Sequence, residues 1–433
     1  MRGKLYFLLF IWVIIMVLFL ASCSENPEPI SSITDIPGVS DTTPEISTGE
    51  QTSAPVLTDR TFLAKDRYCI AGKGEENATI RVDGGTKPAY AKVIDGQFIV
   101  EVFLENQNAQ DVYLYLYAKS ENKDESEALT VTVRKSEKRE SRPVYIGKEN
   151  HLHYNETIKD FLGNSVFNDN DLNDIKTRAE NLQQRLIDEG LTTKVIIFVS
   201  PSHNTIYPET MPDFLAEQKT GDNSRLKQLT EIFKDSTVKF INPYERLMKE
   251  KENYLIYNRT DTHWNELGAY FGYCELYDYI GETFPSAKPR PLSDFNVYNA
   301  IVRGGDLIPM LDFDQSEYIE NAMVVRIKNP SVLELHRGDT DEISYQETVY
   351  HTFHEYNEDN TDNSKPSIIM YRDSFSISMM SPMAETSGRI IFNYMWNYDI
   401  NINYVKEINP DFLIIQRVER SLDDLYDTFL KFK

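Results

Sequence analysis

The sequence predicts an α/β protein built on a parallel sheet, preceded by a small all-β module. From about residue 142 to the end, short apolar runs alternate with amphipathic helical stretches, which is typical of βαβ units. Between about residues 58 and 135, apolar residues recur at every second position instead, as in strands with one buried face. At 433 residues, of which 41% are hydrophobic and 26% charged, the chain can bury the cores of two such domains.

Residues 1–22 have the layout of an export signal. Met1-Arg2-Gly3-Lys4 precedes an apolar run over residues 5–20, and Ala21-Ser22-Cys23 follows it. Leu20-Ala21-Ser22-Cys23 also resembles the lipobox of bacterial lipoproteins, which implies that Cys23 is acylated and anchors the protein to the outer side of the membrane. The alternative is an uncleaved transmembrane anchor. Both alternatives predict that the folded part lies outside the cytoplasm.

Residues 23–57 are rich in Ser, Thr, Pro and Glu and poor in large apolar residues, so we expect a disordered tether. The formal net charge of -23 opposes binding to nucleic acid or to anionic surfaces and favours neutral or cationic substrates. Cys69 and Cys274, the cysteines left after lipidation, are too few for a disulfide framework, and we expect each to be a small buried residue.

The all-β module, residues 58–135, is predicted from strand patterns and turn signals. Asp83-Gly84-Gly85 and Asp95-Gly96 are turn sequences at hairpin spacing. The expected strands are residues 68–72, 78–82, 97–102, 112–118 and 129–133. The module resembles the bacterial Ig-like sandwiches of surface proteins, which implies a spacer or a weak ligand binder.

The second domain, residues 142–433, is predicted from helices that alternate with buried strands. Helices are expected at residues 172–188 and 225–234. The expected strands are residues 194–199, 238–241, 367–371 and 412–415. Such strands form a parallel sheet with helices on both faces, and functional sites in these sheets lie at the carboxyl ends of the strands.

Two short segments of this domain contain the residue types of a catalytic triad. Ser374 follows the strand at residues 367–371, and a helix is expected at residues 376–385, so the serine lies at a strand-turn-helix junction. Asp261 and His263 are separated by one residue, so an extended backbone can point both side chains the same way. His263 would take the proton of Ser374 while Asp261 orients the imidazole. The alternative for Asp373 and Ser374 is helix capping.

A series of phrases in the second domain resembles the SGNH-hydrolase-like proteins related to alginate O-acetylation proteins, and their relatives named for an Asp-His-His-Trp motif. The most specific phrase is Asp261-Thr262-His263-Trp264. The others are Val144 to Lys148, Pro201 to Glu209, Gly305-Asp306-Leu307, Arg372 to Phe375 and Val418-Glu419-Arg420. The resemblance implies an SGNH-like, flavodoxin-like sheet and a triad of Asp261, His263 and Ser374. The chain departs from the family at His203, where lysine is more common, and lacks separate Gly and Asn oxyanion blocks.

Further residues in these phrases are candidates for substrate binding, each with an ordinary structural alternative. The candidates are Trp264, Arg372, Tyr207, Arg259 and Asp306. For Trp264 the alternative is core packing, and for Arg372 it is an ion pair. Glu419 and Arg420 are expected to form an internal ion pair. His351 and His354 lack an acidic or cysteine cluster, so no metal site is predicted there, and no cofactor is expected.

Together these features predict a lipid-anchored, extracytoplasmic O-acetyltransferase that uses a Ser-His-Asp triad to acetylate a polysaccharide hydroxyl. Because acetyl donors are made in the cytoplasm, the resemblance implies a membrane-bound O-acyltransferase as partner. Two alternatives stay open: a carbohydrate acetylesterase with the same triad, and a non-catalytic glycan-binding or assembly lipoprotein.

Overall fold

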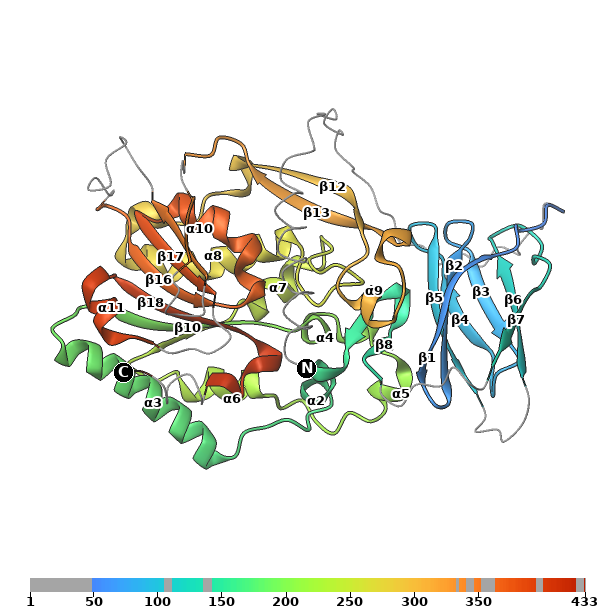
Figure 1. The fold of residues 1–433 in the computed structure, drawn as a ribbon, viewed down its shortest axis with the longest axis horizontal. Helices are drawn as coiled ribbons and strands as arrows, with labels where there is room; N and C mark the ends of the chain where they lie inside the picture. Colours follow the sequence, from blue (N-terminus) through green and yellow to red (C-terminus); the bar gives the residue numbers. More distant parts are fainter. Residues whose placement is uncertain are drawn as a thin grey trace. The chain divides into compact units, whose positions relative to one another are not determined.

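A computed structural model describes most of the chain from residue 49 onward (Figure 1). The described residues are 49–104, 111–134, 142–331, 335–339, 346–351, 363–394, 400–425 and 432. The predicted signal, Cys23 and most of the predicted tether lie outside them, as do residues 135–141, which join the two predicted domains, and His354. Among the described residues, no helix combines the length and apolar character needed to cross a membrane.

The N-terminal module consists of two antiparallel sheets, as expected for a sandwich. One sheet has the order β1-β2-β5, with β1 at Val56–Ala64, β2 at Arg67–Lys73 and β5 at Gln97–Phe103. The other has the order β4-β3-β6-β7, with strands β3 (Thr79–Asp83), β4 (Ala89–Lys92), β6 (Val112–Lys119) and β7 (Leu129–Val133). The alternating apolar residues of both sheets, such as Ile70, Val100 and Leu116, form the core between them.

The second domain is organised around a seven-stranded sheet with the order β11-β10-β18-β16-β17-β15-β14. Its parallel strands are β10 (Lys194–Ser200), β11 (Lys239–Ile241), β16 (Ser367–Arg372), β17 (Arg389–Tyr394) and β18 (Phe412–Val418). The four predicted strands are therefore present and parallel. The prediction missed β17 and an antiparallel edge, made of β15 (Gln346–His351) and β14 (Leu335–Asp339).

Helices cover both faces of this sheet, because alternate residues of each buried strand point to opposite sides (Figure 1). Ile196 and Phe198 of β10 pack in the core that contains α8 (Glu266–Thr283). Val195, Ile197 and Val199 pack in the opposite core, which contains residues of α3 (Asp169–Asp188), α6 (Arg225–Ile232) and α11 (Ile402–Ile408). The two-sided covering that the sequence predicts is confirmed.

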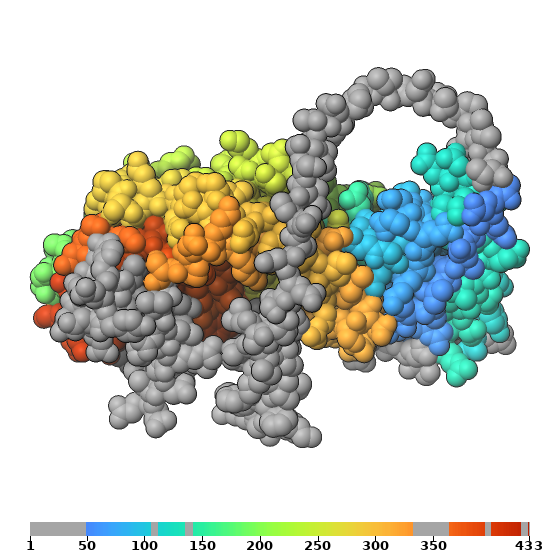
Figure 2. Space-filling view, turned by 90° about the horizontal axis from the view of Figure 1, so that it is seen from above, coloured from blue at the N-terminus to red at the C-terminus, as the bar shows by residue number. Residues whose placement is uncertain are grey.

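Short elements complete the domain. The short helices are α2 (Ile158–Phe161), α4 (His203–Ile206), α5 (Asp213–Ala216), α7 (Tyr244–Glu250), α9 (Leu307–Met310) and α10 (Met380–Thr386). Two hairpins pair β8 (Val144–Ile146) with β9 (Leu152–Tyr154) and β12 (Phe295–Arg303) with β13 (Ile319–Ile327). The 3₁₀ helices are Lys148–Asn150, Asn155–Thr157, Pro208–Thr210, Pro285–Ala287, Leu292–Asp294, Gln315–Glu317, Ser374–Met379 and Glu419–Ser421. Figure 2 shows the surface made in part by the orange β12–β13 hairpin.

The β1-β2-β5 sheet packs against the second domain through an apolar cluster. Cys69 and Ile99 lie in this cluster with Leu152 and Leu307. The Asn150 amide donates to Gln97 O at 3.0 Å and accepts from Ile99 N at 3.1 Å, so its polar atoms are satisfied where the two parts meet. Cys69 and Cys274 are free and buried, as expected from the sequence.

Candidate active site

Ser374 lies at the carboxyl end of β16, in a turn that Asp373 fixes. Asp373 caps the 3₁₀ helix Ser374–Met379 by accepting from Phe375 N at 2.9 Å. The same carboxylate accepts from Val418 N at 2.6 Å and from the Gln416 amide at 2.8 Å, which ties the turn to the neighbouring strand β18. The predicted helix at residues 376–385 therefore begins two residues earlier, as a 3₁₀ helix, before α10 continues it.

Asp261, His263 and Ser374 form one hydrogen-bonded chain. His263 Nε2 lies 2.7 Å from Ser374 Oγ, and His263 Nδ1 lies 2.7 Å from Asp261 Oδ1. The side chains of Asp261 and His263 are 21% and 29% exposed, so the chain is accessible from solvent. When Nδ1 carries the proton, it donates to Asp261 and Nε2 accepts from the serine hydroxyl. This is the arrangement in which a histidine activates a serine nucleophile.

The charges around His263 favour its role as a base. Burial alone would lower the pKa of His263, but the negative charges of Asp261 and Asp306 outweigh burial and raise this pKa above its ordinary value. Burial would raise the pKa of Asp261, but the His263 charge and its hydrogen bonds lower it. Asp261 is therefore ionised at neutral pH, as the partner of an imidazolium must be.

Asp306 lies beside the triad rather than in a separate substrate pocket. Its carboxylate accepts from Thr262 N at 2.7 Å and from Thr262 Oγ1 at 2.6 Å. Oδ2 of Asp306 also lies 3.6 Å from His263 Nδ1. Burial and the charge of Asp261 raise the pKa of Asp306 to about 6. Its described contacts are those of a group that supports the imidazole.

The second domain is similar to known proteins. Residues 144–332 match the family model described as an SGNH hydrolase-like domain, acetyltransferase AlgX. The fold of this domain, a parallel sheet with helices, is SGNH-like. A search of curated protein sequences finds no significant match.

Several solved structures resemble the chain. Bacillus cereus PatB1 with a sulfonyl adduct is 17% identical, with 61% of this chain and 93% of that chain covered and a TM-score of 0.42. A DHHW family protein from Eubacterium siraeum is 12% identical, with 71% and 91% covered and a TM-score of 0.44. The O-acetyltransferase domain of Pseudomonas putida AlgJ is 13% identical, with 65% and 92% covered and a TM-score of 0.39.

Trp264 of the SGNH hydrolase-like domain is a packing residue beneath the triad. Its side chain is buried, and its Nε1 donates to Phe375 O at 2.8 Å. The ring also meets the Phe375 ring edge-on, with centroids 5.5 Å apart. Trp264 therefore links the segment that contains His263 to the turn that contains Ser374, and its expected role as a substrate contact is replaced by the packing alternative.

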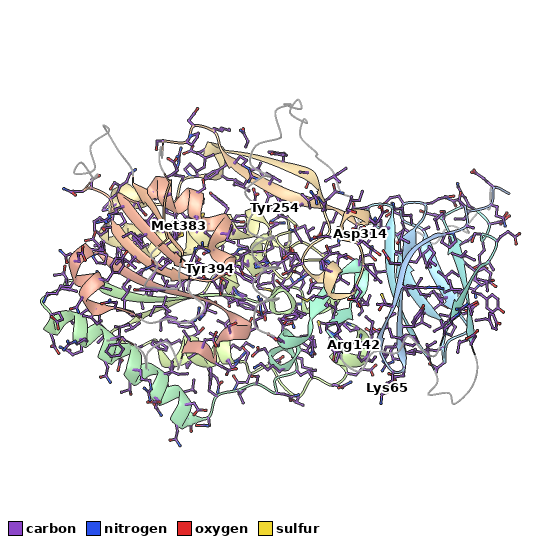
Figure 3. All side chains as sticks on the ribbon, viewed as in Figure 1. Lys65, Arg142, Tyr254, Asp314, Met383 and Tyr394 are labelled. Carbon is purple, nitrogen blue, oxygen red and sulfur yellow. The ribbon has the colours of Figure 1, made fainter. Side chains whose placement is uncertain are left out.

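Of the remaining predicted substrate-binding residues, Tyr207 and Arg259 make contacts away from the triad, and Arg372 lies beside it. Tyr207 is buried, and its hydroxyl accepts from Ile256 N at 3.0 Å. Arg259 pairs with Asp95 of the sandwich at 3.3 Å. The Arg372 guanidinium lies over the ring of Tyr394, which Figure 3 labels at the end of β17, at 4.7 Å from the ring centroid. Its Nη1 donates to the backbone carbonyl of Asp373 at 3.3 Å, so of these three only Arg372 lies next to the Ser374 turn.

The expected ion pair between Glu419 and Arg420 is wrong. Glu419 accepts from Ser202 N at 2.9 Å and from Thr205 Oγ1 at 2.6 Å. The Arg420 guanidinium lies over Phe375, 5.4 Å from the ring centroid, and its charge lowers the pKa of His263. Glu419 and Arg420 lie in the 3₁₀ helix Glu419–Ser421 after β18, and the partners of each come from distant segments, so the sequence alone did not report them.

Three buried histidines lie close together near Asp261, and their contacts were not predicted from the sequence because His203 comes 52 residues after His151. Nδ1 of His151 lies 2.9 Å from Nε2 of His203, and His153 Nε2 lies 3.2 Å from Thr210 Oγ1. The ring of His203 stacks on that of Tyr257, with centroids 5.3 Å apart. Burial lowers the pKa of His153 to about 4 and those of His151 and His203 well below their ordinary value. All three are therefore neutral at pH 7.

Asp261, His263 and Asp306 are also the one group of described residues whose ligand atoms are spaced as around a metal ion. The described hydrogen bonds already engage these atoms: Asp261 holds Nδ1 of His263, and both oxygens of Asp306 accept from Thr262. A metal ion would have to displace the contacts that orient the base. The arrangement of these residues fits acid–base chemistry.

Proposed function

We propose that this chain is an extracytoplasmic O-acetyltransferase that carries an acetyl group on Ser374 and passes it to a hydroxyl of a surface polysaccharide or exopolysaccharide. The observation that carries the proposal is the chain of two 2.7 Å contacts from Asp261 through His263 to Ser374. The match of residues 144–332 to the AlgX acetyltransferase family supports acetyl transfer as the reaction.

The reaction has two steps. In the first, Ser374 Oγ attacks the carbonyl carbon of an activated acetyl group while His263 Nε2 takes the hydroxyl proton and then gives it to the leaving group. In the second, His263 takes the proton of a sugar hydroxyl, whose oxygen attacks the acetyl-serine ester. Ser374 leaves with the proton from His263, so the enzyme is regenerated and the sugar holds the acetyl group.

The oxyanion of each step would lie near the start of the 3₁₀ helix. The N–H of Phe375 donates to Asp373, so the cap engages it. Ser374 is the first residue of that helix, and an N–H in that position has no acceptor within the helix. We therefore propose the Ser374 N–H as one oxyanion donor, since backbone N–H groups at a helix start stabilise negative charge.

The N-terminal sequence supports the proposed location. An export signal that ends in a lipobox-like Leu20-Ala21-Ser22-Cys23 would acylate Cys23 and hold the enzyme on the outer face of the membrane. Residues 23–57 would serve as the tether. Because acetyl donors arise in the cytoplasm, we propose a membrane-bound O-acyltransferase as the partner that supplies the acetyl group.

A carbohydrate acetylesterase is the second candidate. The side chain of His263 is 29% exposed, so water can reach the base that would otherwise act on a sugar hydroxyl. Both activities share the acetyl-serine intermediate. They differ in the acceptor, so the rate at which the acetyl group is lost to water in the presence of an oligosaccharide separates them.

The proposal is tested in cells by replacing Ser374 with Ala and measuring the acetyl content of the surface polysaccharide. We expect acetylation to disappear while the protein still binds the glycan. Ser376→Ala is the matched control, because Ser376 lies in the same 3₁₀ helix but is fully buried, and its Oγ donates to Asp373 O at 3.0 Å. Unchanged acetyl content in the Ser374→Ala strain would refute the enzyme and favour a glycan-binding protein.

A further inference from the structure

Asp306 holds the residue that separates Asp261 from His263. Both of its carboxylate oxygens are used by Thr262: Oδ1 accepts from the backbone N at 2.7 Å and Oδ2 from the hydroxyl at 2.6 Å. Thr262 is buried, so water does not replace these bonds. Asp261 and His263 are the residues on either side of Thr262. When the backbone and side chain of Thr262 are held in place, the directions in which the Asp261 and His263 side chains leave the backbone are held as well.

The carboxylate of Asp306 also lies on the same side of the imidazole as Asp261. Its Oδ2 is 3.6 Å from His263 Nδ1, and its backbone N donates to Asp261 Oδ2 at 3.3 Å. Two carboxylates thus approach one ring nitrogen, while Ser374 occupies the other nitrogen. A negative charge at this distance favours the charged form of the imidazole.

The backbone around Asp306 is built for this close approach. A Cβ at Gly305 would lie 2.6 Å from the Cα of Asp261, so any side chain there would push the two segments apart. Gly305 N donates to Thr260 Oγ1 at 2.7 Å, and Leu307 N donates to Thr260 O at 3.1 Å. Residues on both sides of Asp306 are therefore bonded to the segment that leads into the triad.

Other charged and titratable groups surround the pair. Arg420, after β18, lowers the pKa of His263. Burial raises the pKa of Tyr154 on β9, and the charge of Asp306 adds to this increase. Burial likewise raises the pKa of Glu320 on β13, and the charge of Asp261 adds to that increase. Glu320 accepts from Arg259 N at 2.6 Å and from the Thr260 hydroxyl, so it is held away from the ring of His263. Asp306 is thus the second carboxylate that contacts the imidazole.

We propose that Asp306 is a positioning residue for the base. It clamps Thr262 and places a second negative charge beside Nδ1 of His263, which keeps the proton on Nδ1 and makes Nε2 a stronger acceptor for the Ser374 proton. The inference rests on the proposed function for its catalytic consequence, but its structural and electrostatic content is independent of the acyl group and the acceptor.

The test is Asp306→Asn in the full chain, which keeps the shape of the side chain and an oxygen for Thr262 N but removes the charge. The titration of the His263 ring, followed by NMR and assigned with a His263→Gln spectrum, is expected to move to lower pH. With a soluble acetyl ester as substrate, the acid limb of kcat/KM should move in the same direction. We expect kcat to fall on the order of tenfold with KM unchanged, far less than the roughly 10⁴-fold loss when a triad aspartate is replaced.

Thr262→Val separates the clamp from the charge. This change removes the hydroxyl that donates to Asp306 and that also lies 3.3 Å from His263 Nδ1, but it keeps the carboxylate. We therefore expect kcat to fall while the His263 titration shifts less than in Asp306→Asn. Thr262→Ser keeps the hydroxyl and should restore kcat. An Asp306→Asn protein that folds normally and titrates at the unchanged pH would overturn the proposal.

If Asp306→Asn does not fold, the proposal is tested on the unchanged protein by following the NMR signal of the Asp306 carboxyl carbon as a function of pH. Two sites 3.6 Å apart titrate as a coupled pair, so the Asp306 and His263 curves should each show the ionisation of the other. Two independent single-step curves would contradict the proposal. Coupled curves in a protein that acetylates nothing would refute the proposed function and leave the positioning role of Asp306 in place.

Discussion

Asp373 and Ser374 are adjacent, yet their side chains have different tasks. The sequence allowed either residue to cap the following helix. In the structure the Asp373 side chain caps the helix by accepting a hydrogen bond from Phe375 N. The hydroxyl of Ser374 contacts His263 instead. Because a dedicated neighbour satisfies the helix start, the serine hydroxyl keeps its proton directed at the base. This division of roles argues against the capping interpretation of Ser374.

The charge of Arg420 shifts the pKa of His263 in the direction opposite to the shift caused by Asp306. Its positive charge lowers the pKa of His263, so Arg420→Gln should raise that pKa. Since the base must be neutral to take the serine proton, the acid limb of kcat/KM is expected to move to higher pH, opposite to the shift in Asp306→Asn. The pH profile of kcat/KM, recorded for each of the two variants with the same acetyl ester, measures both shifts of the acid limb. Shifts in the same direction in the two variants would contradict this electrostatic account.

At the scale of elements, helix α8 is shaped to accept Trp264. Asn265 caps it by accepting from Leu267 N and Gly268 N, so the helix begins directly after the triad segment. A Cβ at Gly272 would lie 2.8 Å from the Trp264 ring. The ring lies in the space left by this glycine and reaches the carbonyl of Phe375 beside Ser374. The helix thereby supports both halves of the site.

We expect Gly272→Ala to destabilise the protein although alanine is the better helix former. The added methyl group collides with a buried indole, and such overpacking costs about 1–3 kcal/mol, more than the roughly 1 kcal/mol that helix propensity returns. Denaturant unfolding measures the difference.

Gly281→Ala is the control for this prediction, because its Cβ would meet only the Lys288 side chain and backbone, and Lys288 is exposed. We expect no loss of stability there. Equal midpoints for both variants and the unchanged protein would contradict the role assigned to Gly272.

The strands and the triad were predictable from the sequence because their signals are local. The apolar run of β10 and the phrase Asp261-Thr262-His263 each lie within a few residues. Strand β17 was missed because its apolar run, Ile390, Ile391 and Phe392, is only three residues long before Asn393. The contacts of Arg420 and of the three buried histidines depend on residues far apart in the chain, and no spacing rule reports them.

At the scale of the whole molecule, the buried histidines make stability depend on pH. Their pKa values in the folded protein lie below the ordinary value of about 6.5, so between about pH 4 and 6.5 the unfolded chain binds protons that the folded chain excludes. Stability should therefore be highest above pH 6.5 and fall as the pH decreases. Each such histidine lowers the free energy of unfolding by at most about 1.4 kcal/mol per pH unit in this window.

Urea unfolding at a series of pH values from 7 to 4.5 checks this dependence. His153→Gln, whose side chain does not titrate and can still hydrogen-bond, should show a shallower decrease than the unchanged protein. A free energy of unfolding that stays constant over this window would show that the histidines are charged or exposed in the folded state.

The most direct test of the central claim is intact-protein mass spectrometry of the full chain after incubation with an activated acetyl ester, followed by addition of an oligosaccharide. We expect one acetyl group on the protein, absent from Ser374→Ala, present in Ser376→Ala, and transferred to the sugar. An adduct that persists in Ser374→Ala, or the absence of any adduct with every donor, would contradict the claim.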